Sequence, residues 1–268
     1  KNTKDALTYA KNINMFSNVG DMTVEEADNQ MKAIMSSYGG VEKAVKAGTS
    51  AVKSAGKEYS LMTEIMDGAN YAGNNYAVTA GDMTTALSKF ANVASTNGVP
   101  AIEAMSYALG AQETIQDASK VGNGLKTIMT NLTGLKTSAK DGSIGLNKTA
   151  KALKNVGIDV LDSSGNVRDM TEIMDELGNK WDTLSKKDRL ALGEAIAGKT
   201  QLNVLNGMMN NWDKIKKFQT EYKQGMMVGS SEKENARYID SIEGKITKLK
   251  NNIANLATTI FSSNMFKG

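Results

Sequence analysis

The stretch that points most directly to a helical fold is IDSIEGKITKLKNNIANLATTI, residues 239–260. Its large apolar residues recur at alternating steps of three and four, at Ile239, Ile242, Ile246, Leu249, Ile253, Leu256 and Ile260. This spacing is a heptad repeat, with the four residues spaced by seven from Ile239 at a and the other three at d. A period of 3.5 keeps one narrow stripe facing a partner helix, whereas a helix lying on a globular core carries a wider apolar face. We therefore predict a long, coiled-coil-like C-terminal helix over residues 231–268, with these seven residues as its seam.

The seam has more than one possible partner. It can pack on the body of the same chain, or it can self-associate with a second helix. In a parallel assembly, Lys245 at g and Lys250 at e would approach between chains and repel. An antiparallel hairpin or a larger bundle is therefore as consistent with the sequence as a parallel dimer. The helix runs almost to Gly268 and the chain begins at Lys1, so we expect a segment of a longer protein whose helix continues.

Residues upstream of the seam also favour helices. There is one proline, aromatic residues are sparse, and few stretches alternate as strands do. An all-α fold is therefore predicted. Glycines are expected to divide the chain into helices of ordinary length, at positions 20, 39, 40, 68, 73, 81, 98, 110, 134, 142, 157, 165 and 198.

Helix-capping pairs mark several predicted helix starts. They are Thr23 with Glu26, Thr79 with Asp82, Asp169 with Glu172, Ser185 with Asp188, and Ser231 with Glu234. Residues 134–147 are predicted to form a loop, and residues 158–168 one small β-hairpin. The expected organisation is a multi-helix globular body over residues 1–229, followed by the C-terminal helix over residues 231–268.

The composition excludes the commonest catalytic machinery. The chain has no histidine and no cysteine, which excludes His-containing zinc sites and Ser-His-Asp or Cys-His nucleophiles. Its acidic pairs lack an apolar setting that would separate their pKa values. The turn at 162–166 lacks the ligand order of a calcium-binding EF-hand, and Gly198-Lys199-Thr200 lacks the first glycine of a phosphate-binding loop. We predict no catalytic, cofactor-binding or metal-binding residue, and hence no enzyme.

The charge pattern predicts no sequence-specific binding of nucleic acid. The formal net charge is +3, and the only arginines are Arg168, Arg189 and Arg237. Arginine is the side chain that best reads phosphates and base edges, whereas scattered lysines are typical of a solvated surface. No segment reaches the ~20 consecutive apolar residues that would span a bilayer.

Six segments carry a family resemblance. They read GNNYAV (73–78), KVGNGLKTI (120–128), GIDVLDSSGNVRD (157–169), LGNKWDTLS (177–185), AGKTQ (197–201) and YIDSIEGKI (238–246). In order and spacing, the chain from residue 69 onward resembles the conserved core region of bacteriophage tail tape measure proteins. Residues 1–68 resemble it more loosely. Thr200 departs from the basic residue more usual in that family, which has no catalytic residues here to carry over.

The resemblance implies a structural protein of the virion, located in the lumen of the tail tube. It implies a protein that is assembled in the cytoplasm of the bacterial host with tail assembly chaperones and that sets tail length. It also implies contacts with tail tube and tail tip proteins, and release with the DNA at ejection. The part of such a protein that sets tail length, its ruler, should be a continuous helix rising about 1.5 Å per residue. Because glycines interrupt residues 1–229, we expect a folded domain beside the ruler, with the rod beginning near Ile239.

Two other functions are compatible with these residues. The chain could belong to an envelope-acting or pore-forming delivery module of a phage tail-like particle, with any host envelope contact made by regions outside residues 1–268. A wall-degrading enzyme would need a catalytic dyad or metal ligands, which the sequence does not offer. Long helical repeats elsewhere in the protein would favour a ruler, whereas a run of ~20 apolar residues would favour membrane insertion.

Overall fold

The fold is all-α, as predicted. A computed structural model describes residues 3–46, 48–50, 59–137, 144–241, 245–247 and 250. The first part of the chain forms α1 (Thr3–Val19), α2 (Val24–Ser37), α3 (Val41–Ala44), α4 (Leu61–Asn75), α5 (Ala80–Thr96), α6 (Ala101–Ile115) and α7 (Ala118–Leu132). The second part forms β1 (Leu135–Thr137), β2 (Ile144–Leu146), α8 (Lys148–Asn155), α9 (Met170–Trp181), α10 (Lys186–Ile196), α11 (Leu202–Asn210), α12 (Trp212–Lys223) and α13 (Ser230–Asp240).

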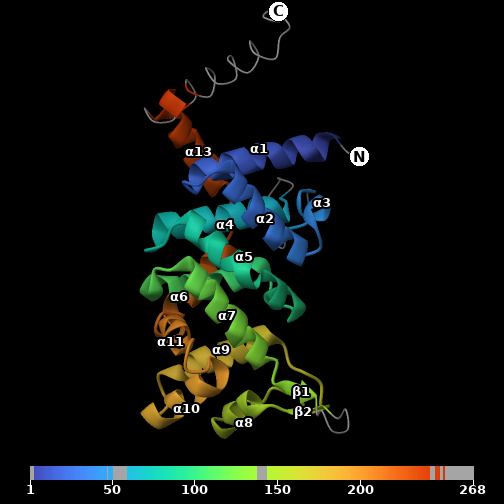
Figure 1. Cartoon of the computed structure of the whole chain (residues 1–268), viewed down its shortest axis with the longest axis vertical. Coiled ribbons are helices and arrows are strands. Elements are labelled where there is room, and N and C mark those ends of the chain that lie inside the picture. The colour runs from blue at the N-terminus through green and yellow to red at the C-terminus, as the bar shows by residue number, and fades with distance from the viewer. Residues whose placement is uncertain are drawn as a thin grey trace, which may run out of the picture.

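The helices are stacked along one long axis (Figure 1). α1 and α13 lie at one end, α4 to α7 form the middle, and α8, α10 and the two strands lie at the other end. α6 is the central helix, since it packs on α5, α7, α11 and α12. Most of its residues are buried, including Met105, Tyr107 and Leu109, and a helix apolar on most sides must be covered on most sides.

The predicted helix starts are largely confirmed, because capping is a local interaction. Thr23 and Glu26 form a complete capping box on α2, with Glu26 N donating to Thr23 Oγ1 at 3.1 Å. Thr79 accepts the amide of Asp82, and Ser185 accepts that of Asp188. At α9 the prediction is wrong in detail, since Asp169 accepts the amide of Thr171. At α13 the predicted pair of Ser231 and Glu234 is wrong, since the helix begins at Ser230 and its N-cap residue Gly229 makes no side-chain cap bond. α1 was not predicted.

Several glycines lie inside helices where the sequence predicted boundaries. A Cβ at Gly68 of α4 would lie 2.7 Å from Ile102 Cδ1 of α6, and one at Gly110 of α6 would lie 2.5 Å from Ile215 Cδ1 of α12. Both distances are too short for a side chain. These glycines therefore allow α4, α6 and α12 to approach closely, and this long-range requirement outweighs the weak helix propensity of glycine.

The strands differ from the prediction in position. β1 and β2 form an antiparallel pair in the segment predicted to be a loop, with Leu135 opposite Leu146. The hairpin predicted over residues 158–168 is reduced to a single antiparallel bridge between Leu161 and Val167. There, Asp162 Oδ1 accepts the amides of Ser164 and Asn166 at 2.8 Å, so the carboxylate closes the turn.

Candidate functional site at the base of the C-terminal helix

The predicted seam lies only partly within the described residues. Ile239 is half-buried near the end of α13, and Ile246 is 48% exposed in the helical turn over residues 245–247. The other five seam residues, Ile242, Leu249, Ile253, Leu256 and Ile260, lie outside the described residues. The seam therefore stays a prediction, and the site that the structure does describe is the base of this helix.

The C-terminal helix is interrupted at Ser241. α13 ends at Asp240, and Ser241 has extended backbone angles of φ −67° and ψ 160°. The Ser241 amide donates to Arg237 O at 2.9 Å, and its carbonyl accepts the amide of Lys245 at 3.0 Å. Ser241 thus follows the last residue of α13 and has the extended backbone conformation that serine favours at a helix N-cap. α13 therefore ends before Ser241, whose own backbone is not helical.

A buried carboxylate holds the first turn of α13. Asp67 on α4 is 1% exposed, and its two oxygens accept the amides of Gly229 at 2.6 Å and Ser231 at 2.8 Å. These amides belong to the first turn of α13, where backbone N–H groups have no partner within the helix. The negative charge also lies at the positive end of the helix dipole. Asp67 therefore caps α13 from outside the helix.

Further contacts fix the same joint, which we call the Asp67 junction. The Tyr59 hydroxyl donates to Asp67, and Asn70 Nδ2 on α4 donates to Ser230 Oγ at 2.6 Å. Burial raises the pKa of Asp67, while the hydrogen bonds from Tyr59 and from the Ser231 and Gly229 amides oppose that rise. Burial, followed by the nearby Asp67 carboxylate, also raises the pKa of Tyr59. The donors offset part of the cost of burying the charge.

A second buried carboxylate extends the joint toward α12. Glu64 lies one turn before Asp67 on α4 and is buried, and the Tyr222 hydroxyl donates to it. On the other side, Asn18 of α1 donates from Nδ2 to Asn235 Oδ1 of α13 at 3.0 Å. The base of α13 is thereby tied to the body through α1 and α4, and α4 is tied to α12.

Sequence reasoning did not find this junction. α4 carries Glu64, Asp67 and Asn70 at steps of three, interspersed with the apolar residues Ile65, Met66 and Ala69. The sequence did contain a signal for buried polar residues that need partners, namely polar residues at helical spacing within an apolar helix. Such a helix has no solvated face and must bury them. Their partners at positions 229 to 231 could not be found from local pattern, because they lie about 160 residues away along the chain.

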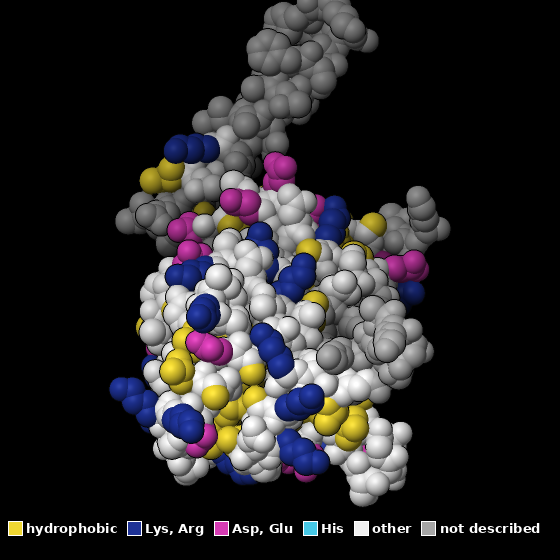
Figure 2. Space-filling model, turned by 60° about the horizontal axis from the view of Figure 1, so that its bottom comes forward, with side chains coloured by type: hydrophobic (Ala, Val, Ile, Leu, Met, Phe, Trp, Pro, Cys, Tyr) yellow, Lys and Arg dark blue, Asp and Glu magenta, His cyan; other side chains and the backbone are white. Residues whose placement is uncertain are grey.

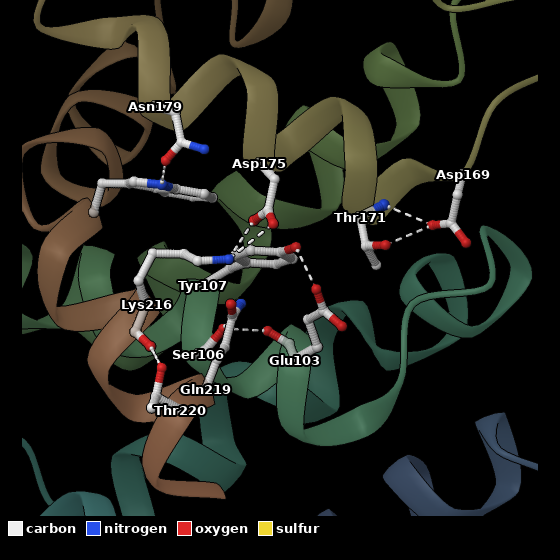
Figure 3. A network of polar contacts seen from close by, with 11 residues as sticks. Glu103, Ser106, Tyr107, Asp169, Thr171, Asp175, Asn179, Lys216, Gln219 and Thr220 are labelled. Carbon is white, nitrogen blue, oxygen red and sulfur yellow. Dashed lines mark hydrogen bonds and ion pairs between the residues drawn. The ribbon is translucent and has the colours of Figure 1, made fainter. Parts of the chain in front are cut away.

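A second polar network, the α9–α12 clasp, joins α6, α9 and α12 (Figure 3). Lys216 Nζ lies 2.8 Å from Asp175 Oδ2, and Trp212 Nε1 donates to Asn179 Oδ1 at 3.1 Å. The Trp212 ring stacks on the buried Tyr107, with centroids 6.1 Å apart and planes at 11°. The clasp thus combines an ion pair, an indole hydrogen bond and an aromatic stack.

The α6 side of the clasp is also hydrogen-bonded. Gln219 Nε2 donates to Ser106 Oγ at 2.9 Å, and the Tyr107 hydroxyl donates to Glu103 Oε1 at 3.3 Å. Burial raises the pKa of Glu103, and the Tyr107 bond opposes that rise. Burial raises the pKa of Tyr107 well above its usual value, so it is a hydrogen-bond donor at neutral pH. These groups join helices, and Tyr107 is covered by protein on all sides.

In the part of the chain that the structure describes, neither a metal-binding cluster nor a membrane-spanning helix is found. Within those residues, no group of three or more Asp or Glu side chains is arranged to hold a metal ion. Among the same residues, no helix is both long and apolar enough to cross a bilayer. In the Asp67 junction and the α9–α12 clasp, the described polar groups connect one helix to another.

Comparison with known families identifies the class of protein. A family model described as phage-related minor tail protein matches residues 1–198, which contain α1 to α10. No solved structure matches the chain. The family match covers well over half of the 268 residues and includes residues 1–68, where the resemblance to tape measure proteins was looser. The chain therefore belongs to the family of phage-related minor tail proteins and has a structural role in a phage tail.

Proposed function

We propose that this chain is the folded segment of a tail tape measure protein, which sets tail length during assembly, fills the tail tube and leaves with the DNA at ejection. Membership of the minor tail family supports the tail role. The six motif segments from residue 73 to residue 246 support the narrower tape measure function through their resemblance to that family. In this proposal the body over residues 1–229 is an attachment to the ruler.

The observation that carries the proposal is the Asp67 junction. A helical rod that sets tail length can position a folded domain only if the helix that leaves the domain is firmly attached at its base. Asp67 meets this requirement, because two amides at the base of α13 donate to its buried carboxylate. Asn70 adds a third contact through Ser230. Burial of this kind makes the attachment costly to break.

The partners follow from the same proposal. The helical seam beyond Asp240 would pair with another helix, by self-association or within a bundle. Tail tube and tail tip proteins would surround the protein in the lumen of the tube, and assembly chaperones would hold it in the host cytoplasm before the tube forms. The break at Ser241 would let the rod leave the body at an angle different from that of α13.

Tail length measured by electron microscopy tests the proposal. In-frame deletions and duplications of 28 residues would be made in helical sequence of the same gene outside residues 1–268. Each deletion should shorten the tail by about 42 Å, and each duplication should lengthen it equally, since a helix rises about 1.5 Å per residue. Deletions of the same size in a non-helical region serve as the control.

A tail of constant length across the whole series would contradict the ruler. That result would favour the second candidate, an envelope-acting delivery module, in which the length of the helical sequence has no reason to match the tail. Dye release from vesicles by the complete protein would then be the measurement to make.

A further inference from the structure

A groove lies at the end of the molecule that carries α10. It is bordered by Trp181 of α9, by Lys186, Arg189 and Leu190 of α10, and by Leu202 of α11, with a volume of about 390 Å³. Leu190 is 55% exposed and borders the groove together with Leu202, so the hollow offers apolar surface to a partner. Seen from this end, apolar side chains gather between lysine and arginine side chains (Figure 2). We call this surface the α10 groove.

The cations of the α10 groove are not neutralised within the described part of the chain. Neither Lys186 nor Arg189 forms an ion pair with any residue described there. Asp188, which lies between them, is bonded to Ser185 Oγ at the start of α10. A guanidinium and an ammonium group beside an apolar hollow would suit an apolar side chain flanked by carboxylates.

A surface of that chemistry is present elsewhere on the same chain. At the start of α2, Val24 is 51% exposed between the exposed acids Asp21 and Glu25. Neither acid forms an ion pair with a described residue. The turn before α2 touches the first turn of α5, since a Cβ at Gly81 would lie 2.8 Å from Gly20 O, and Asp82 follows there. We call this acidic surface around Val24 the α2 tip.

The two surfaces cannot meet within one molecule. α10 lies at one end of the stack and α2 lies toward the other, with the middle helices between them (Figure 1). We propose that the α10 groove of one copy binds the α2 tip of the next copy. Val24 then packs against Leu190 and Leu202, while the flanking acids approach Lys186 and Arg189.

This contact is heterologous, because the two surfaces are different. A heterologous contact leaves one groove and one tip unused on each pair, so it repeats into a ring or an open filament. The contact joins one apolar side chain and its charged neighbours to a single groove, so a single contact should be weak and form only at high local concentration. The inference is independent of the tape measure proposal and of the C-terminal seam, because it uses neither.

Sedimentation velocity of the full chain over a range of concentrations tests the proposal. The wild type should associate as concentration rises, and less so in high salt, since the pairs at the rim are screened. A groove variant, Arg189→Glu with Leu190→Ser, and a tip variant, Val24→Ser with Glu25→Lys, should each weaken association by about tenfold or more. A control on α8, Lys148→Ser with Lys151→Glu, changes exposed charge away from the groove and should behave as the wild type.

The decisive step is to mix the two variants. The groove variant keeps an intact tip and the tip variant keeps an intact groove, so an equimolar mixture should form a 1:1 dimer that grows no further. Circular dichroism spectra would first establish that both variants are folded. A monomeric wild type at every concentration, variants that associate like the wild type, or a mixture that stays monomeric would each overturn the proposal.

Discussion

The Asp67 junction and the α9–α12 clasp join distant helices through carboxylates, but they differ in burial. Asp67 is 1% exposed and accepts bonds from Tyr59 and from two amides of another segment. The side chains of Asp175 and Lys216 in the clasp are each 38% exposed. A buried carboxylate leaves several donors without a partner when it is removed, whereas a half-exposed one leaves groups that water can reach. Removing the Asp67 carboxylate should therefore lower the free energy of unfolding more than removing that of Asp175.

The largest effect is expected for Asp67→Ala. It leaves the Tyr59 hydroxyl and the amides of Gly229 and Ser231 without their acceptor in a buried site. We expect the free energy of unfolding to fall by about 3–4 kcal/mol, measured by urea denaturation. Asp175→Ala serves as the matched control and should cost less than about 1 kcal/mol. Equal losses for the two variants would remove the distinction between the junction and the clasp.

The next effect comes from packing in the clasp rather than from charge. A Cβ at Gly178 would lie 2.0 Å from Trp212 Cε2, so Gly178→Ala must displace an indole that stacks on Tyr107 and donates to Asn179. We expect a loss of about 2 kcal/mol by the same measurement, together with a change in tryptophan fluorescence.

Gly145 provides the control for that substitution. A Cβ there would meet nothing within 4 Å, and Gly145→Ala should change stability by less than about 0.5 kcal/mol. A tolerated Gly178→Ala would mean that Trp212 has room to move, and that the clasp depends on its polar contacts more than on its packing.

A smaller effect should appear in the dependence of stability on pH. Burial raises the pKa of Asp67, so the folded state binds this proton more tightly than the unfolded state. The resulting stability is fully present below the unfolded pKa and is lost as pH rises through the folded pKa. The wild type should therefore lose stability relative to Asp67→Asn as pH rises above about 4, by at most about 1.4 kcal/mol per pH unit. A difference that stays constant from pH 3 to pH 8 would show that the hydrogen bonds cancel the effect of burial.

The same contrast explains how far the sequence could predict the structure. Thr23 with Glu26 and Ser185 with Asp188 were predictable, because each pair acts within one helical turn. The Asp67 junction was not, because the donors to Asp67 lie about 160 residues away and nothing local pairs them with it. The prediction that glycines divide one helix from the next failed at Gly68 for the same reason. Glycine is a weak helix former, and the close approach of Ile102 on α6 explains the place of Gly68 inside α4.

The predicted seam is a different case. Its heptad spacing is local information, but what a heptad packs against is not, and Ile246 is 48% exposed where it is described. Ser241 also shows that a regular apolar period does not by itself produce an unbroken helix. A serine can end one helix and cap the next without changing the spacing of the apolar residues around it.

The smallest effect is expected for Lys216→Met, which removes the ion pair to Asp175 but keeps most of the length of the side chain. Both partners are 38% exposed, so water and salt already weaken their attraction. We expect a loss of about 0.5 kcal/mol at low ionic strength, and almost none in 1 M salt, by urea denaturation at both salt concentrations. A loss above about 2 kcal/mol that persists in high salt would mean that the pair is shielded from solvent. The clasp would then resemble the Asp67 junction, and burial of the carboxylate in the folded protein would no longer be what separates the two joints.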